Sequence, residues 1–361
     1  MRTSPPRNHS HTGQCQVGPR LSSLRPFLCL ASLLVLGLLA GCAGKPTPPL
    51  ARHEFSAVHM AIPFRIVLYS RDPVQATNAA QAAWQRIAEL NRILSDYDPD
   101  SELSRLGATS PHTNAVPISP ELARVLEVAT DVSRASEGAF DLSVGPLTQL
   151  WRRTRRQREL PDDGKRLAAI AATDWRSIEL SKGRTARLLR PGMRLDAGGI
   201  AKGYALDEAT RVLREHGIRS SMVAGAGDIV VTAPPPGERG WKIEVAPLDV
   251  PGAPPSRSVL LRDASLCTSG DIFQHVEING VRYSHIVDPR TGLGLTDHSL
   301  VTVIGPNGIT TDALSTALSV AGPAKASRIC APFGAEFHTV RSIHGKLETV
   351  ESPGFRRWER R

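Results

Sequence analysis

Apolar residues recur with helical spacing in four stretches of the chain. In residues 75–94 and 120–137 they fall three or four positions apart, which places them on one side of a helix. Gly138 follows the second stretch and is typical of the left-handed residue that closes a helix. The same spacing predicts shorter helices over residues 204–216 and 311–321.

Hydroxyl side chains mark two helix starts. Ser101, after the turn formed by Asp98 and Pro99, is expected to cap a short helix. Thr310 or Thr311 is expected to cap the helix over residues 311–321 in the same way.

Period-two alternation predicts strands between these helices. They cover a strand or hairpin at residues 54–69 with a bend at Pro63, a hairpin at 174–189, and strands at 194–196, 222–232, 241–245, 258–261, 281–287 and 300–304. Because strands and helices do not alternate as βαβ units, the pattern indicates an α+β fold of mixed sheets with flanking helices.

The first 41 residues have the pattern of a secretion signal. Arg20 and Arg25 precede an apolar run over residues 27–40, which is too short to span a membrane comfortably. The run ends at Cys42 in Leu-Ala-Gly-Cys, which resembles the lipobox of bacterial lipoproteins. We therefore expect lipidation of Cys42; the alternative is an ordinary signal peptide. Residues 42–52 are expected to be a tether and 53–361 one domain.

Charge adds little to this picture. The chain has a net charge of +9, and without residues 1–41 it has 40 basic and 35 acidic residues, a net charge of +5. Such a mild excess is no argument for a nucleic-acid partner. The basic run Trp151–Arg158 is expected to be a solvated helix or loop, with contact to anionic lipid as a second possibility.

The stretch Leu195–Asp207, LDAGGIAKGYALD, is the richest in candidate chemistry. Gly198 and Gly199 allow a close backbone approach just before a predicted helix, whose first N–H groups suit an anion. Lys202 adds a cation, and Asp196 could accept hydrogen bonds or lie near a metal. The stretch fits a phosphate-binding loop, although it is not a Walker loop. The alternative is a tight strand-to-helix turn with a surface lysine.

Three motifs that occur in a fixed order favour the phosphate-binding interpretation over the tight turn. LDAGGIAKGYALD is followed by YSHIVDPRTG at residues 283–292 and TDALSTAL at 311–318. Together they resemble the ApbE family of FAD:protein FMN transferases, over about residues 60–318. The resemblance implies an ApbE-like flavin transferase fold and a Mg²⁺-dependent transfer of FMN from FAD to a threonine hydroxyl of another protein, with release of AMP. Hydrolysis of FAD to FMN and AMP, or non-enzymatic FAD binding at the membrane, remain alternatives.

The same resemblance implies the site residues. FAD would be bound by Met60, Tyr97, Ala139, Phe140, Asp141, Asp196, Lys202, His285 and Ile286. Mg²⁺ would be held by Gly199, Asp312, Ser315 and Thr316. His285, beside Asp288, or Asp312 would accept the hydroxyl proton, since a histidine can exchange protons near neutral pH. From the residues alone, Tyr97 could equally cover the core, and Asp312 could cap a helix.

The chain departs from the family pattern at three positions. Ala61 and Ala226 replace glycines, and Cys267 replaces an alanine and is expected to be a small buried residue. The sequence leaves open whether Cys267 pairs with Cys330.

The expected partners follow from the resemblance and the signal. They are FAD, acceptor flavoprotein subunits of membrane redox complexes, and a membrane reached through the lipid anchor. The expected location is the bacterial cell envelope, facing the periplasm, on the inner membrane.

Overall fold

The computed structural model describes residues 48–181, 183–272, 274–343 and 345–359. The predicted signal peptide and Cys42 therefore lie outside the described residues. Pro49–Arg361 forms one compact unit, to which this description applies. Ala51 and Arg52, assigned above to the tether, begin the first strand. Within the described ranges, no helix combines the length and the apolar composition that a membrane span requires.

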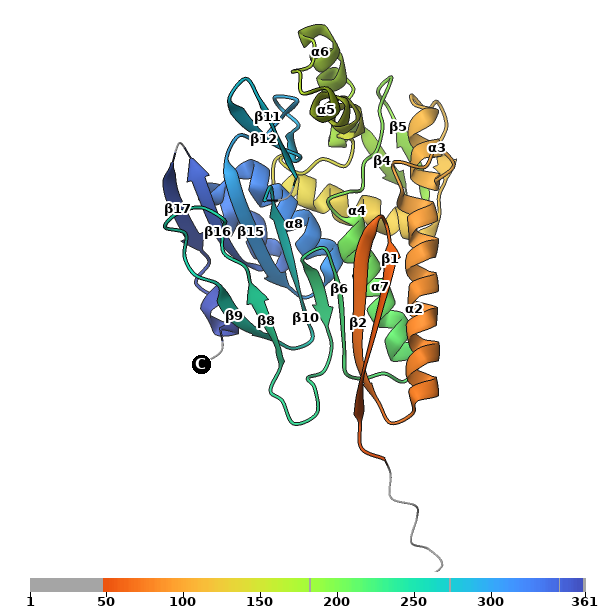
Figure 1. The fold of residues 1–361 in the computed structure, drawn as a ribbon. Helices are drawn as coiled ribbons and strands as arrows, with labels where there is room; N and C mark the ends of the chain where they lie inside the picture. Colours follow the sequence, from red (N-terminus) through yellow and green to blue (C-terminus); the bar gives the residue numbers. More distant parts are fainter. Residues whose placement is uncertain (1–47, 182, 273, 344, 360–361) are drawn as a thin grey trace, which may run out of the picture. The chain divides into compact units, whose positions relative to one another are not determined.

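One antiparallel sheet of eight strands forms the centre of this unit (Figure 1). Its order is β1 (Ala51–His59), β2 (Ile62–Ser70), β6 (Ser221–Gly225), β7 (Asp228–Val231), β10 (Ala264–Gly270), β15 (His298–Gly305), β16 (Glu336–Ile343) and β17 (Lys346–Glu351). Successive residues of β2 face opposite sides of this sheet, since Ile66 and Leu68 pack in one core cluster and Val67 in another.

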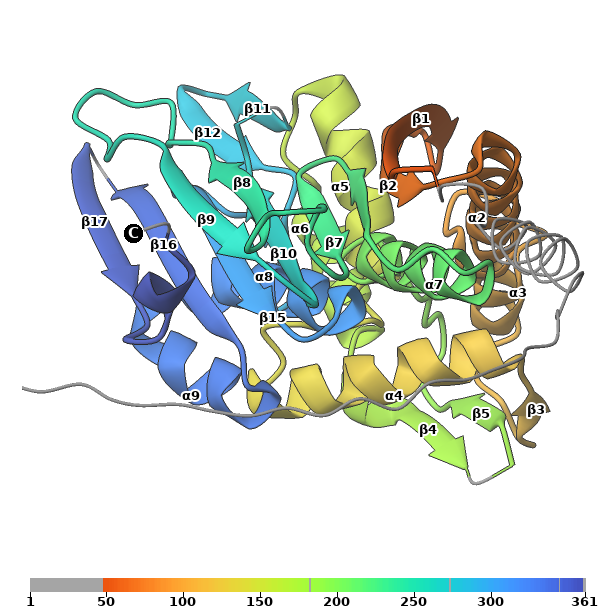
Figure 2. The same ribbon diagram turned by 90° about the horizontal axis from the view of Figure 1, so that it is seen from below.

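Helices cover one face of the central sheet (Figure 2). They are α2 (Pro73–Leu94), α3 (Glu102–Ala108), α4 (Pro120–Ala135), α7 (Ala201–Glu215), α8 (Gly308–Ala321) and α9 (Ala326–Cys330). Two further helices, α5 (Gly145–Gln157) and α6 (Asp163–Ala171), pack in a separate apolar cluster. Helices α2, α4, α7 and α8 share the large core with this face, and α8 contacts α7, β10 and β15. The ends of α7 and α8 are therefore fixed against the sheet by apolar packing.

Smaller elements complete the fold. The sheets are β3 (Val116–Pro117) with β5 (Thr185–Leu188) and β4 (Ile178–Ser181), β8 (Trp241–Val245) with β9 (Arg257–Leu261), β11 (His275–Ile278) with β12 (Val281–Ser284), and β13 (Val287–Asp288) with β14 (Leu293–Gly294). Short 3₁₀ helices cover Trp175–Ser177, Pro323–Lys325, Ala331–Phe333 and Phe355–Trp358. The β8–β9 hairpin packs on the face of the central sheet opposite the helices.

The predicted α+β class is confirmed, as are the four helices. Ser101 caps α3 by accepting a hydrogen bond from Ser104 N. The cap of α8 was predicted wrongly: Asn307, three residues before Thr310, accepts a hydrogen bond from Thr310 N. The basic run forms the second half of α5, so the helical form expected for it is confirmed. It is not solvated throughout, because Trp151 and Thr154 are buried and Arg152 pairs with two aspartates.

Four strand predictions need correction. The first hairpin turns at Met60 and Ala61, with φ of 48° and 60°, and Pro63 lies inside β2, whose pairing with β6 begins only at Phe64. The missing N–H of Pro63 therefore costs no bond to β6. Residues 222–232 form the hairpin β6–β7, and residues 281–287 are divided between β12 and β13.

The backbone explains two of these corrections. The β6–β7 turn needs positive φ at Ala226 (49°) and Gly227 (92°), so the GAGD sequence ends one strand and begins the next. Residues 194–196 form no strand, because Arg194 makes only an isolated bridge to Val144.

Candidate functional site

Two helices cross where glycines remove the side chains between them. A Cβ on Gly203 of α7 would lie 2.1 Å from the carbonyl oxygen of Gly308 at the start of α8. Asp207, one turn later in α7, accepts hydrogen bonds from Gly308 N at 2.7 Å and Ile309 N at 2.8 Å. A carboxylate at a helix N-terminus satisfies otherwise free N–H groups. This crossing brings Asp312 of α8 next to the first turn of α7.

Lys202 and two buried carboxylates meet at this crossing. The Lys202 Nζ lies 3.1 Å from Asp312 Oδ1 and 3.2 Å from Asp228 Oδ2. Gly203 N donates to Asp312 Oδ2 at 2.9 Å. Burial acts to lower the pKa of Lys202, but the two carboxylates outweigh it and raise the pKa. Burial raises the pKa of Asp228 to about 7, against the opposing effect of Lys202.

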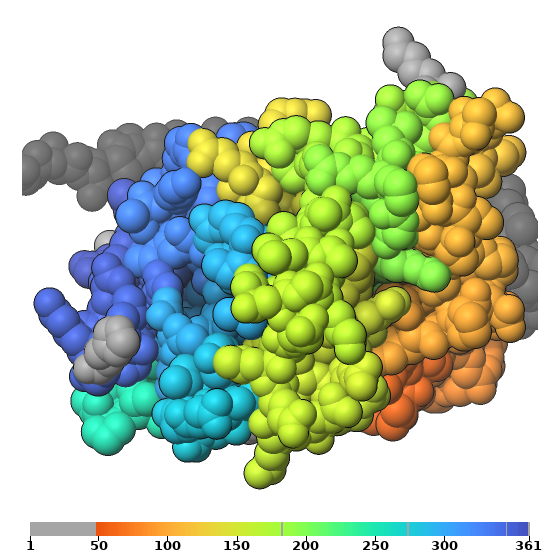
Figure 3. Space-filling model, turned by 90° about the horizontal axis from the view of Figure 1, so that it is seen from above, coloured from red at the N-terminus to blue at the C-terminus, as the bar shows by residue number. Residues whose placement is uncertain are grey.

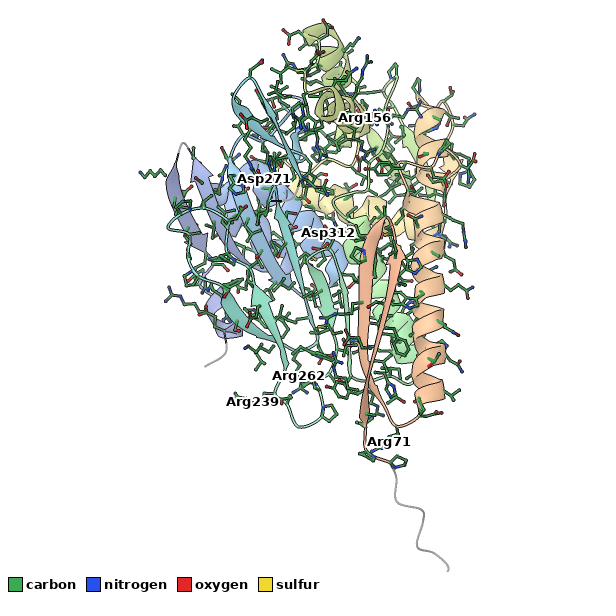
Figure 4. The ribbon with its side chains drawn as sticks, in the orientation of Figure 1. Arg71, Arg156, Arg239, Arg262, Asp271 and Asp312 are labelled. Atoms are coloured by element: carbon green, nitrogen blue, oxygen red, sulfur yellow. The ribbon has the colours of Figure 1, made fainter. Side chains whose placement is uncertain are left out.

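Three hydroxyl side chains meet at the next turn of α8. The Ser269 Oγ, at the end of β10, lies 2.7 Å from Ser315 Oγ and 3.4 Å from Thr316 Oγ1. A Cβ on Gly199 would lie 2.9 Å from Thr316 Oγ1, so the glycine loop touches α8 here. Figure 4 labels Asp312 on α8. Gly199, Asp312, Ser315 and Thr316, predicted as one group, are thus close together.

A second group lies around Arg152 of α5. The Arg152 Nη2 donates to Asp196 Oδ2 at 2.9 Å and also pairs with Asp96. Its guanidinium lies 4.0 Å from the centroid of the Tyr97 ring, which is 76% exposed. Asp196 Oδ1 in turn accepts a hydrogen bond from Gly198 N at 2.8 Å. Burial and the charge of Asp196 raise the pKa of Asp96 to about 6.

His285 follows β12 and is held by backbone contacts. Its backbone N donates to the carbonyl of Gln274 at 2.9 Å, and its Nδ1 lies 3.1 Å from the same oxygen. The preceding Ser284 carbonyl accepts from Trp151 Nε1 of α5 at 2.8 Å. Burial lowers the pKa of His285 to about 4, and the charges of Arg155 and Lys202 act in the same direction.

Comparisons with known proteins show which family has this sequence and fold. The ApbE family model matches residues 60–337. A Vibrio cholerae protein named FAD:protein FMN transferase is 31% identical over 302 residues, 82% of this chain and 87% of its own length. A Treponema pallidum protein of the same name is 30% identical, over 74% of this chain and 78% of its own. The solved flavin transferase ApbE from Vibrio cholerae has a TM-score of 0.76 and 26% identity, and the match covers 86% of this chain and all of that one.

The chain belongs to the ApbE family. It is therefore an enzyme of the flavin-transferase type, and the resemblance noted in its three ordered motifs is confirmed. The fold confirms the ApbE-like architecture expected from the same motifs.

Several site residues of this ApbE chain were not predicted from the sequence. Asp228 lies beside Lys202, and Ser269 lies beside Thr316. Both follow, by two residues, positions noted only as departures from the family pattern, Ala226 and Cys267. Arg152 gave no signal, because it is one of five arginines in a run that looked solvated. Asp207 was visible in the central stretch, but its role as a cap for α8 depends on the crossing of the helices.

His285 and Asp288, which are neighbours in the YSHIVDPRTG motif, have separate partners. Asp288 pairs with Arg290 at 2.8 Å. The low pKa also corrects the expectation of proton exchange near neutral pH, because the imidazole of His285 is neutral there. Ile286 is half-buried, and its N–H donates to Ser284 Oγ at 3.1 Å.

Four other residues predicted to contact FAD are held by packing or by hydrogen bonds within the protein. Ala139, Phe140 and Asp141 are buried. Asp141 accepts hydrogen bonds from Ser143 N, Ser143 Oγ and Trp175 N, and burial raises its pKa to about 6. Met60 is half-buried in the first hairpin turn and packs against the large core. Contact of these residues with FAD stays a prediction.

The two cysteines of the described residues are both free and buried, so the possible disulfide is not formed. Cys267 is a small buried residue as expected, and its Sγ accepts a hydrogen bond from Thr311 Oγ1 at 3.1 Å.

The donors at the crossing fit a magnesium ion. They are oxygens: the carboxylate of Asp312 and the hydroxyls of Ser315 and Thr316, which follow it by three and four residues on α8. No group of three or more His, Cys, Asp or Glu side chains able to hold a metal occurs in the ranges that the structure describes. Mg²⁺ suits such a site, because it accepts one or two carboxylates and completes its shell with neutral oxygens and water.

Proposed function

We propose that this chain transfers FMN from FAD to a threonine hydroxyl of an acceptor protein, in a Mg²⁺-dependent reaction that releases AMP. The observation that carries the proposal is the group of Lys202, Asp312 and Thr316 beside the glycine loop at Gly199. Family membership supplies the reaction type, since relatives covering most of the chain are named FAD:protein FMN transferases.

The reaction forms and breaks one bond each at phosphorus. The threonine Oγ attacks the phosphorus that carries the riboflavin, and the P–O bond to the AMP phosphate breaks. AMP leaves with the bridging oxygen, and the hydroxyl proton must pass to a base. His285 is neutral at pH 7 and can accept it, as can the carboxylate of Asp312.

The bound ion would be held by Asp312, Thr316 and the carbonyl of Gly199, with Ser315 beside them. Magnesium would supply positive charge where negative charge builds on the phosphates. Lys202 contributes a second positive charge at the same place, and Asp228 keeps its ammonium in position. Asp207 and Gly203 support these groups by fixing the crossing of α7 and α8.

The remaining partners are proposed from the sequence. Lipidation of Cys42 would hold the domain at the inner membrane, facing the periplasm. Acceptors would then be flavoprotein subunits of membrane redox complexes, which expose a threonine on the same side.

The test is a product assay with the domain from residue 43 onward, FAD, Mg²⁺ and an acceptor protein carrying one target threonine. We expect covalent flavin on the acceptor and AMP in equal amounts, and no labelling when that threonine is replaced by alanine. The matched control is the acceptor with the threonine replaced by serine, which keeps a hydroxyl. AMP and free FMN without labelled acceptor would identify a hydrolase instead, and no turnover of FAD would contradict the proposal.

A further inference from the structure

Arg155 is a half-buried arginine of α5 whose charge has no partner. Its side chain makes no hydrogen bond or ion pair with any residue in the described part of the chain. Burial lowers its pKa, while the charged groups acting on it are Tyr97 and Arg152, and no described carboxylate is among them. Partial removal of a guanidinium from water is costly unless an anion compensates it.

Arg152, on the same helix, has the carboxylate partners that Arg155 lacks. It lies three residues before Arg155, and residues at this spacing share a helix face. Arg152 is paired with both Asp96 and Asp196, yet the next guanidinium on that face is paired with neither. The local arrangement therefore leaves one positive charge available.

Helix α5 lies beside the segment that holds His285. Trp151, one turn before Arg155, donates its Nε1–H to the carbonyl of Ser284 at 2.8 Å, and the charge of Arg155 lowers the pKa of both Tyr97 and His285. His285 is also influenced by Lys202, so cations from α5 and α7 act on it together. The Lys202 ammonium is already balanced by Asp312 and Asp228, both within 3.2 Å of it. Arg155 is thus the cation near His285 that still lacks an anion in the described structure.

We infer that Arg155 binds the diphosphate of FAD and so helps to position it beside His285. The inference rests on the proposed function, which makes FAD the substrate. A guanidinium suits this task because its planar N–H groups can bind two phosphate oxygens at once. The flavin ring and the adenine carry no charge that would need it.

Arg156 provides a matched control. It is the next residue of α5, it is exposed, and it carries the same charge; Figure 4 labels it on this helix. Figure 3 shows the face of the protein on which residues 145–171 lie. Replacing Arg155 or Arg156 by glutamine removes one positive charge from neighbouring positions of one helix. A difference between the two variants therefore reports position and not net charge.

The experiment measures dissociation constants of FAD and riboflavin by quenching of flavin fluorescence, at 50 mM and 500 mM KCl with Mg²⁺ present. Arg155→Gln is expected to weaken FAD binding about tenfold or more at low salt, since charged hydrogen bonds are worth about 1.5–3 kcal/mol. The loss should shrink at high salt. Riboflavin, which lacks phosphate, should bind both proteins equally. Arg155→Lys should recover part of the affinity, and Arg156→Gln should match the wild type.

Two results would overturn the inference. One is unchanged FAD affinity in Arg155→Gln; the other is an equal loss for FAD and riboflavin, which would mean that the arginine only supports the local structure. Both leave the proposed function standing if the wild type still transfers FMN. A wild type that binds FAD no better than riboflavin would instead remove the proposed function, and this inference with it.

Discussion

At the scale of single residues, Lys202 is the centre of the site's electrostatics. Its ammonium lies between Asp312 and Asp228, whose side chains are almost completely buried. Two carboxylates so close together would repel each other without a cation. The ammonium therefore has a structural task in addition to any contact with substrate.

This arrangement predicts the effect of Lys202→Met. The variant leaves two buried carboxylates without their cation, and we expect it to lose about 3–5 kcal/mol of folding free energy, as is typical when one partner of a buried ion pair is removed. Mg²⁺ should restore more of the melting temperature in the variant than in the wild type, because a metal can take over the carboxylate of Asp312. Calorimetry with and without Mg²⁺ measures this. Equal responses of both proteins to Mg²⁺ would contradict it.

His285 leads to a prediction about pH. Its pKa of about 4 lies below the ordinary value of 6.5, so at pH 4–6.5 the unfolded chain binds more protons than the folded one at this position. The folded state should therefore lose stability as pH falls from 6.5 to 4. His285→Gln should make this loss smaller, and an NMR titration of the wild type should place the imidazole midpoint near 4. A midpoint near 6.5 would mean that the ring is solvated.

At the scale of elements, the crossing of α7 and α8 positions the site. Gly203 and Gly308 allow the two backbones to touch, and Asp207 caps α8 from the side. The sequence predicts both helices from their apolar spacing. It does not predict their crossing, because that depends on which glycines face each other across a distance of about 100 residues.

Gly203→Ala tests the crossing. The new Cβ would lie 2.1 Å from Gly308 O and 2.7 Å from Asp312 Cβ, so the helices must separate. We expect a loss of about 1–3 kcal/mol in urea unfolding, as is typical of overpacking, and a large loss of transferase activity. Gly164→Ala in α6 is the control, because its Cβ would meet only the side chain of Asp162, at 3.2 Å. Full activity in Gly203→Ala would show that the spacing of α7 and α8 is not needed.

At the scale of the whole molecule, local patterns predicted more than long-range contacts. The ordered motifs identify the family and gather Gly199, Asp312, Ser315 and Thr316 correctly. The turns at residues 60–61 and 226–227 were missed, because alanine at positive φ gives no signal in a sequence. Arg152 and Asp228 were missed because their partners, Asp196 and Lys202, lie far away along the chain.

The anchor is a prediction at the same scale. We expect Cys42 to be lipidated, because the apolar run ends in Leu-Ala-Gly-Cys. Cys42→Ser should leave the precursor unprocessed at this site and abolish labelling of the protein with a radioactive fatty acid. Normal processing of the variant, with unchanged membrane fractionation, would mean that Cys42 is not the anchor.

The most direct test of the account is the rate of acceptor flavinylation by Asp312→Asn across a Mg²⁺ titration at saturating FAD. Asparagine keeps the shape of the side chain but removes the carboxylate that pairs with Lys202, one turn before Thr316 on α8. We predict a rate loss on the order of a thousandfold and loss of most of the response to Mg²⁺, because metal stabilisation of phosphate charge is worth several kcal/mol. Thr316→Ser, which keeps its hydroxyl, should be nearly unchanged. A near wild-type rate with a normal Mg²⁺ response in Asp312→Asn would contradict the assignment of this site.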